Sequence, residues 1–364
     1  VGAMRRIGLA GLVAIVTAMW LLGTPTDTAV AQEGPGAATH DVVEAVVTNV
    51  LVDDTVVGSD GRDQPFQQLE MRLTSGPNAR EMIVVDHGQF SGINVPRYDV
   101  GDRLLLSAQG PDASSPTYYV VDAVRSDVLL VLLFVFVALT ITVGRWRGLA
   151  SLVSLAVSFL VIFYFVLPRI AAGNDPVLTA IVGAAVIIPF TFYLSHGLNR
   201  KTTAAVVGTL IALGLTGLLA VIAADAAQLT GYSSEEAALL QSATTTAFDM
   251  RGVLLASIII GLLGVLDDIT VNQAAIVNQL RGTAPYISNA EAVRRAMDVG
   301  TDHIASLVNT LVLVYASAAM PLLLLFSTGT GSFSELINYE MVAEEVVRAL
   351  VASIGLIMAV PITT

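Results

Sequence analysis

The chain has 364 residues, of which 54% are hydrophobic and 13% charged, and its mean hydropathy is +0.74. These values lie far from those of soluble domains and predict a polytopic α-helical membrane protein. The net charge of -12 gives no basic surface for nucleic acid, and the absence of cysteine excludes disulfides, thiolate metal sites and cysteine nucleophiles.

The first 31 residues have the pattern of a targeting segment. Arg5 and Arg6 precede the apolar run from Ile7 to Leu22, and an Ala-Val-Ala sequence ends at residue 31. The pattern predicts either a cleaved signal peptide or a retained N-terminal signal anchor, and both place the following segment outside the cytoplasm. Residues 32–40 are rich in small residues and are predicted to form a linker.

Residues 41–126 change character and predict a small extracytoplasmic β domain. Five short runs of alternating apolar residues are separated by turn signals: VVEAVVTNVLV, FQQLEMRL, EMIVVDHG, DRLLLSA and YYVVDAV. Short strands at this spacing are typical of a small barrel or sandwich, and we expect a β-barrel or OB-like domain.

Residues 127–364 are predicted to form a transmembrane domain of seven helices, so the whole chain has seven or eight. The expected spans are 128–143, 149–167, 176–194, 203–224, 252–277, 304–326 and 346–364. With the β domain outside, nine basic residues fall inside (Arg5, Arg6, Arg145, Arg147, Arg200, Lys201, Arg281, Arg294, Arg295) and three outside (Arg169, Arg251, Arg348). This bias predicts the orientation by the positive-inside rule.

Two adjacent acids interrupt the fifth of these spans. The uncharged stretch from Gly252 to Leu266 is about 22 Å long as a helix, shorter than the bilayer core of about 30 Å, so the span must include Asp267 and Asp268. One helix face would carry Gly261, Gly264, Asp268, Asn272 and Ala275. Glycines allow close helix packing, so we expect Asp268 rather than Asp267 to have the internal role.

The next span offers partners for these acids. Asp302, Ser306 and Asn309 share one face, and His303 lies beside its entrance. Ionisable groups inside a span mark ion or proton paths, and a histidine can exchange protons near neutral pH. The transport or proton-path candidates are Asp267, Asp268, Asn272, Asp302, His303, Ser306 and Asn309; alternatively, the helix tilts and the acids only reach the membrane interface.

Several segments carry a family resemblance. GRWRGL (144–149), SHGLNRKT (195–202), FDMRGVLLASIIIGLLGVLDDITVNQAAIV (248–277), VGTDHIASLVNTLVLVYASAAMPLLLLF (299–326) and EEVVRALVASIGLIMAVPIT (344–363) are similar to the YibE/F family of bacterial membrane proteins. The resemblance covers nearly all of residues 125–364 and implies a multi-pass protein of the bacterial inner membrane rather than a particular activity.

A more remote similarity points to a mechanism. The order of a small-residue helix, Asp-Asp, a basic loop and the segment EAVRRAMDVG resembles the core of SecD/SecF and related RND permeases. In those proteins, acids in transmembrane helices take part in proton-driven work. The chain departs from them because seven predicted spans follow the ectodomain, where one RND-type half would have five.

These patterns favour an integral membrane permease or channel-like transporter, coupled to an ion or proton, with no enzymatic activity and no cofactor. The expected partners are the lipid bilayer and a small ion or solute of unknown identity, and self-association of identical copies is left open.

A non-transporting scaffold or regulator that binds a partner through the β domain is the alternative. A minor alternative is a magnesium-dependent polyprenyl-phosphate transferase, because GLLGVLDD is similar to its Asp-Asp motif. No nucleotide-binding P-loop motif occurs, so energy would come from a gradient or a partner chain.

Overall fold

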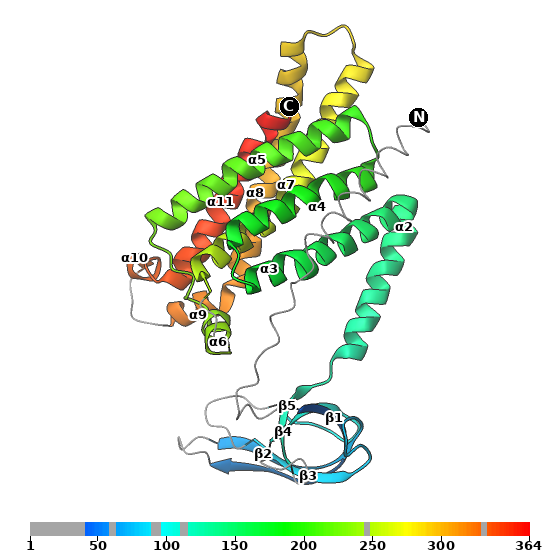
Figure 1. The fold of residues 1–364 in the computed structure, drawn as a ribbon, viewed down its shortest axis with the longest axis vertical. Coiled ribbons are helices and arrows are strands. Elements are labelled where there is room, and N and C mark those ends of the chain that lie inside the picture. The colour runs from blue at the N-terminus through cyan, green and yellow to red at the C-terminus, as the bar shows by residue number, and fades with distance from the viewer. Residues whose placement is uncertain (1–40, 58–62, 89–95, 110–115, 244–247, 329–332) are drawn as a thin grey trace. The chain divides into compact units, whose positions relative to one another are not determined.

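The computed structural model of the chain describes residues 41–57, 63–88, 96–109, 116–243, 248–328 and 333–364 (Figure 1). The predicted targeting segment (1–31) and linker (32–40) lie outside the described residues. Contacts within the chain group it into two compact units, with the boundary in the sequence between residues 139 and 140.

The first unit contains a five-stranded antiparallel sheet, as the alternating runs predict. Its strands are β1 (Asp41–Val57), β2 (Asp63–Leu73), β3 (Met82–His87), β4 (Arg103–Gln109) and β5 (Thr117–Ala123), in the order β3-β2-β1-β4-β5. In the first half of β1, every second side chain enters the core, where Val43, Ala45 and Val47 pack against Leu69 and Leu104. This alternation is the physical basis of the prediction.

The sheet curls so that its two edge strands, β3 and β5, come into contact. No hydrogen-bonded pairing of β3 with β5, which would close a barrel, occurs among the described strands. The small antiparallel sheet is therefore established, and the closed OB-like barrel stays a prediction.

The rest of the described chain is helical. The elements are α2 (Ser126–Val161), the π-helical turn η1 (Ile162–Val166), α3 (Leu167–Ala171), α4 (Pro176–His196), α5 (Arg200–Ala226), α6 (Glu235–Ala243), α7 (Met250–Thr283), α8 (Asn289–Ala318), α9 (Met320–Ser327), α10 (Phe333–Leu336) and α11 (Glu340–Thr363). Side chains of Asp175, Asn199, Asp249 and Ser288 accept hydrogen bonds from the first turns of α4, α5, α7 and α8. These caps satisfy amides that have no partner within the helix and so fix where each helix begins.

Six candidate membrane spans occur among the described residues, where the sequence predicted seven after the β domain. The difference arises in the first candidate, Ser126–Ala171, which is 46 residues long and covers two predicted spans. Its backbone is non-helical at Arg145, with φ 52° and ψ -131°. A Cβ added to Gly148 would lie 2.1 Å from the Thr140 carbonyl oxygen, so the chain bends sharply here and leaves no room for a larger residue. The number of transmembrane helices stays a prediction.

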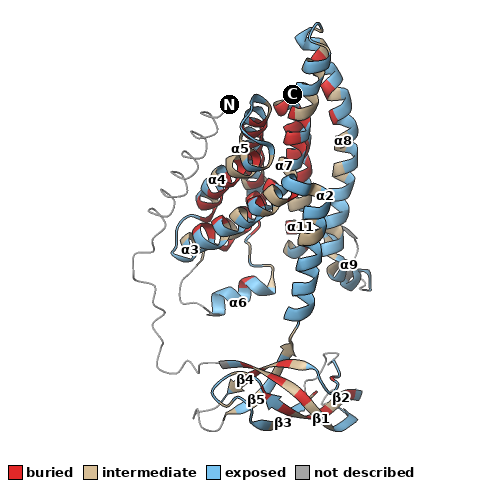
Figure 2. Ribbon diagram, turned by 90° about the vertical axis from the view of Figure 1, so that its right-hand side faces the viewer, coloured by how far each residue is buried: buried red, intermediate tan, exposed pale blue. Residues whose placement is uncertain are grey.

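Helix α7 is central to the helical unit, and it packs against α4, α5, α8 and α11 (Figure 2). Its buried face includes Ile258, Ile259, Leu262, Leu266 and Ile269. Polar side chains also join the helices. The Thr270 hydroxyl lies 2.6 Å from that of Thr209 on α5, and the Gln273 amide donates to the Ala296 carbonyl of α8 at 3.0 Å and to Thr364 at 2.7 Å. These bonds hold α7 in one rotation about its axis.

Candidate functional site

Helix α7 exposes a continuous stripe of small and polar residues. Ser257, Gly261, Gly264, Asp268 and Asn272 are all exposed, and every residue of α7 is described. At 100° per residue these positions fall within about 80° of one another, so they form a single face along the helix. The predicted face containing both glycines and Asp268 therefore exists.

The composition of this stripe is unlike that of a lipid-facing surface. Helix α5 exposes large apolar side chains at almost the same spacing, namely Val207, Ile211, Leu215, Leu218 and Ile222, whereas α7 exposes none. Lipid tails favour apolar side chains, and an acid in contact with them costs several kcal/mol, in the range of about 2.5 kcal/mol upward. The stripe on α7 is therefore built to face water or protein.

The aspartates lie at one end of the stripe, in a hollow of about 410 Å³ that we call the aspartate hollow. Its remaining lining residues come from three helices: Arg147 and Ser151 of α2, Ser195 and His196 of α4, and Gly264, Val271 and Asn272 of α7. Asn272 donates to Asp268 at 3.4 Å, and the Ser154 and Ser195 hydroxyls join α2 to α4 at 3.1 Å. The hollow thus gathers two acids and two basic side chains without an ion pair between them among the described residues.

Several site residues behave differently from the prediction. The structure brings Asp267, Asp268 and Asn272 together, but Asp302, His303, Ser306 and Asn309 do not line the aspartate hollow. Asp302, Ser306 and Asn309 are exposed on α8, and no hydrogen bond among the described residues joins them to the acids. The reason is geometric: α8 is bonded to α7 through Gln273, and Gln273 is about 140° around the helix from Asp268.

The glycines and the two acids also differ from expectation. A Cβ added to Gly261 or Gly264 would meet nothing within 4 Å, so no neighbouring helix approaches them among the described residues. The expectation of close helix packing on this face is wrong. Asp268 is exposed and Asp267 half-buried, so Asp267 is the more enclosed of the two acids.

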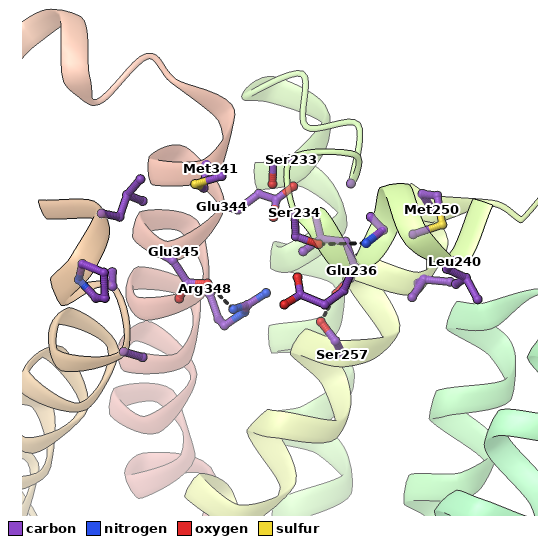
Figure 3. A pocket seen from close by; sticks show the side chains of 18 residues that line it. Ser233, Ser234, Glu236, Leu240, Met250, Ser257, Met341, Glu344, Glu345 and Arg348 are labelled. Atoms are coloured by element: carbon purple, nitrogen blue, oxygen red, sulfur yellow. Dashed lines mark hydrogen bonds and ion pairs between the residues drawn. The ribbon is translucent and has the colours of Figure 1, made fainter. Parts of the chain in front are cut away.

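A second hollow, of about 550 Å³, lies at the start of α7, and we call it the glutamate hollow (Figure 3). It is bounded by α6, by the first turns of α7 and α11, and by the segment that joins α8 to α9. Glu236, Glu344 and Glu345 line it together with Arg348, which pairs with Glu345. Glu340, just outside, accepts hydrogen bonds from the Thr230 hydroxyl at 2.8 Å and the Gly231 amide at 3.0 Å, which ties the α5–α6 connection to α11.

The two hollows open on the same face of α7. Met250, Val253, Leu254 and Ser257 line the glutamate hollow, and Gly264 begins the aspartate hollow. Ser257 and Gly264 are seven residues apart, about 10 Å along the axis, and point within about 20° of each other. Only the uncovered Gly261 separates them on the stripe.

Within the described chain, the pair of Asp267 and Asp268 is not part of a larger cluster of metal-binding side chains. Among the described residues, no three His, Cys, Asp or Glu side chains are grouped so that they could hold a metal ion. Besides each other, the Asp267 and Asp268 carboxylates share their hollow with amide, hydroxyl and basic side chains and with Gly264 and Val271.

Sequence reasoning missed Arg147, His196 and the whole glutamate hollow as functional candidates. One signal could have found them. GRWRGL, SHGLNRKT and the Asp-Asp segment each contribute to the aspartate hollow, while FDMRGVLLAS and EEVVRAL both contribute to the glutamate hollow. The segments that carry the family resemblance thus converge on two sites.

Together, the helical unit with its six apolar candidate spans and the small antiparallel sheet define an integral membrane protein. The model of the YibE/F-like protein family matches residues 132–364, which is more than half of the chain, so the chain belongs to this family. The weaker resemblance to SecD/SecF is not confirmed. Searches of curated proteins and of solved structures gave no match.

Proposed function

We propose that this protein is an integral membrane permease or channel-like transporter that moves a small ion or solute along the exposed stripe of α7. The observation that carries the proposal is that one polar face of a core helix connects two hollows, one at the start of α7 and one around its middle. A helix that served only as an anchor would be expected to expose apolar side chains to lipid, as α5 does.

The aspartates are the coupling groups in this proposal. Two adjacent carboxylates within a membrane span concentrate negative charge at one place, so the pair can attract a proton or another cation. Release of that proton or cation would accompany each transport cycle. Arg147 and His196 line the same hollow and would compete with a cation for the carboxylates, which provides a means of release.

The orientation follows from the distribution of basic residues. By the positive-inside rule, the aspartate hollow, which contains Arg147, would face the cytoplasm, and the glutamate hollow would face the extracytoplasmic space. The bacterial inner membrane is the proposed location. The β domain, for which we propose an OB-like closure, would then stand outside the cytoplasm.

The test is flux through purified protein in liposomes, screened over protons, monovalent ions and divalent ions. Asp268→Asn and Asp267→Asn keep size and hydrogen bonding but remove the exchangeable charge, so each should reduce flux and the double variant should abolish it. Asp302→Asn is the matched control, because Asp302 is an exposed acid of a candidate span outside the hollow. Normal flux in the double variant would exclude the aspartates from the mechanism.

The second candidate function is a scaffold or regulator that binds a partner through the β domain. It is favoured by apolar side chains exposed toward the end of β1, at Leu51, Val52, Val56 and Val57. Exposed apolar groups gathered on one strand are typical of interaction surfaces. A protein without flux for any ion or solute, but with a partner bound through these side chains, would establish this function instead.

A further inference from the structure

The glutamate hollow contains a buried carboxylate with one oxygen that has no hydrogen-bond partner among the described residues. Glu344 is 8% exposed and lines the hollow, and its Oε1 atom has no hydrogen-bond partner. Its carboxylate is within hydrogen-bond reach of Ser233, toward which it points in Figure 3. A buried acceptor without a partner costs about 1–3 kcal/mol, and more when it is charged.

The charge of the hollow selects for a cation. Three carboxylates (Glu236, Glu344 and Glu345) line it against one guanidinium, Arg348, which is already paired with Glu345. An anion would meet repulsion from the two acids that remain without a basic partner there. A positively charged ligand would instead satisfy the free oxygen of Glu344.

The walls of the hollow select for an organic cation over a metal ion. Leu240, Met250, Leu254, Leu322 and Met341 provide an apolar surface, and about 550 Å³ is within the size range of small-molecule sites. Among the described residues, no three metal-binding side chains lie close enough together to hold one metal ion. An ammonium group brings its own N–H donors, which fit the Glu344 carboxylate and the hydroxyls of Ser233 and Ser234.

We infer that the glutamate hollow binds a primary or secondary organic ammonium ion, with Glu344 as its charge partner and the leucine and methionine side chains holding its apolar part. The inference rests on the proposed function in one respect, because it names organic ammonium ions as the class of substrate that enters the α7 stripe at this hollow. Binding itself is independent of transport.

Protection of a cysteine tests the site directly, because the natural chain has no cysteine. Ser257→Cys places a thiol in the lining of the hollow, and Ser242→Cys places one on α6 outside the lining. In the full-length protein in lipid nanodiscs, benzylamine should slow labelling at position 257 by a neutral maleimide and leave position 242 unaffected. Benzyl alcohol has nearly the same shape without the charge, so equal protection by the alcohol would overturn the inference. Protection by Mg²⁺ or Na⁺ in place of benzylamine would also overturn it.

Substitutions then assign the charge partner. Glu344→Gln should raise the half-protecting benzylamine concentration about tenfold or more, the effect of losing one charge-assisted hydrogen bond. Glu235→Gln, on α6 but outside the lining, should have no effect. Ala318→Phe fills the hollow and leaves the Glu344 carboxylate in place, so it should also abolish protection by benzylamine. This variant tests the site even if Glu344→Gln yields no folded protein. Unchanged protection in either variant of the hollow would place the amine elsewhere.

The results separate this inference from the proposed function. Glu344-dependent protection in a protein without flux would retain the ammonium site and overturn the permease. Flux that requires Asp268, together with protection that is unchanged in Glu344→Gln, would retain the permease and overturn the ammonium site.

Discussion

Single residues decide whether the α7 stripe is a path or only an exposed face. Gly261 lies between the two hollows, and nothing lies within 4 Å of a Cβ at this position. A larger side chain can therefore enter without moving any described neighbour. The same substitution would be harmless on a lipid-facing surface and obstructive in a path.

We expect Gly261→Leu to lower flux strongly while leaving the protein folded. Replacing an exposed helical glycine should raise stability by about 0.5–1 kcal/mol, because glycine is a poor helix former. Flux into liposomes and thermal unfolding of the same preparation measure the two effects. Ile211→Phe on the exposed apolar face of α5 is the control and should transport normally. Normal flux with Gly261→Leu would mean that nothing passes this residue.

A second residue-scale prediction concerns His87 in the β domain. Its ring packs against that of Tyr98 in a tilted arrangement, with centroids 4.9 Å apart and an interplanar angle of 41°, and Nε2 lies 3.1 Å from the Pro96 carbonyl oxygen. Burial lowers the pKa of His87 below its ordinary value, although the bond to Pro96 partly opposes this. The unfolded chain therefore binds a proton more readily than the folded domain, and stability falls as the pH drops below about 6.5.

Hydrogen exchange of the full-length protein measures this effect. Peptides from β2 and β3 should exchange faster at pH 5.5 than expected from the intrinsic rate, and His87→Gln should remove most of that pH dependence. The same pH dependence in His87→Gln would assign the effect to other groups.

At the scale of elements, α8 is attached to the helical unit mainly through its first half. Gly300 allows this contact, since an added Cβ would lie 2.6 Å from Val360 Cγ1 and 2.9 Å from Gln273 Oε1. The Gln273 amide is 1% exposed and bonds both α8 and the C-terminal turn of α11. The contact of three helices therefore depends on the absence of a side chain at position 300.

Gly300→Ala should destabilise the protein by about 1–3 kcal/mol, the usual cost of forcing extra atoms into a packed core. The loss should appear as a lower unfolding temperature in detergent. Gly282→Ala near the end of α7 is the matched control, because an added Cβ there meets nothing within 4 Å. Equal stability of the two variants would show that α8 can move away from α7 at little cost.

The same elements show how far sequence reasoning reaches. The alternation in VVEAVVTNVLV and the long apolar runs predicted the strands and most of the spans, because burial periodicity is a local property. The stripe on α7 was also predictable, since helical geometry fixes which residues share a face. What that face meets depends on packing between distant segments. Asp302 was therefore wrongly expected beside Asp268, and Arg147 and His196 were missed.

At the scale of the whole molecule, the proposed transport path requires the two hollows to open to opposite sides of the membrane. The bias of nine basic residues inside against three outside predicts that the α7–α8 connection is cytoplasmic and that α6 is outside.

Single cysteines test this topology cleanly because the chain has none of its own. Asn289→Cys, at the start of α8, should react with a membrane-impermeant maleimide only after cells are opened. Ser242→Cys on α6 and Glu81→Cys in the β domain should react in intact cells. Labelling of Asn289→Cys from outside would place both the aspartate hollow and Arg147 on the wrong side, and the direction of the proposed path would have to be reversed.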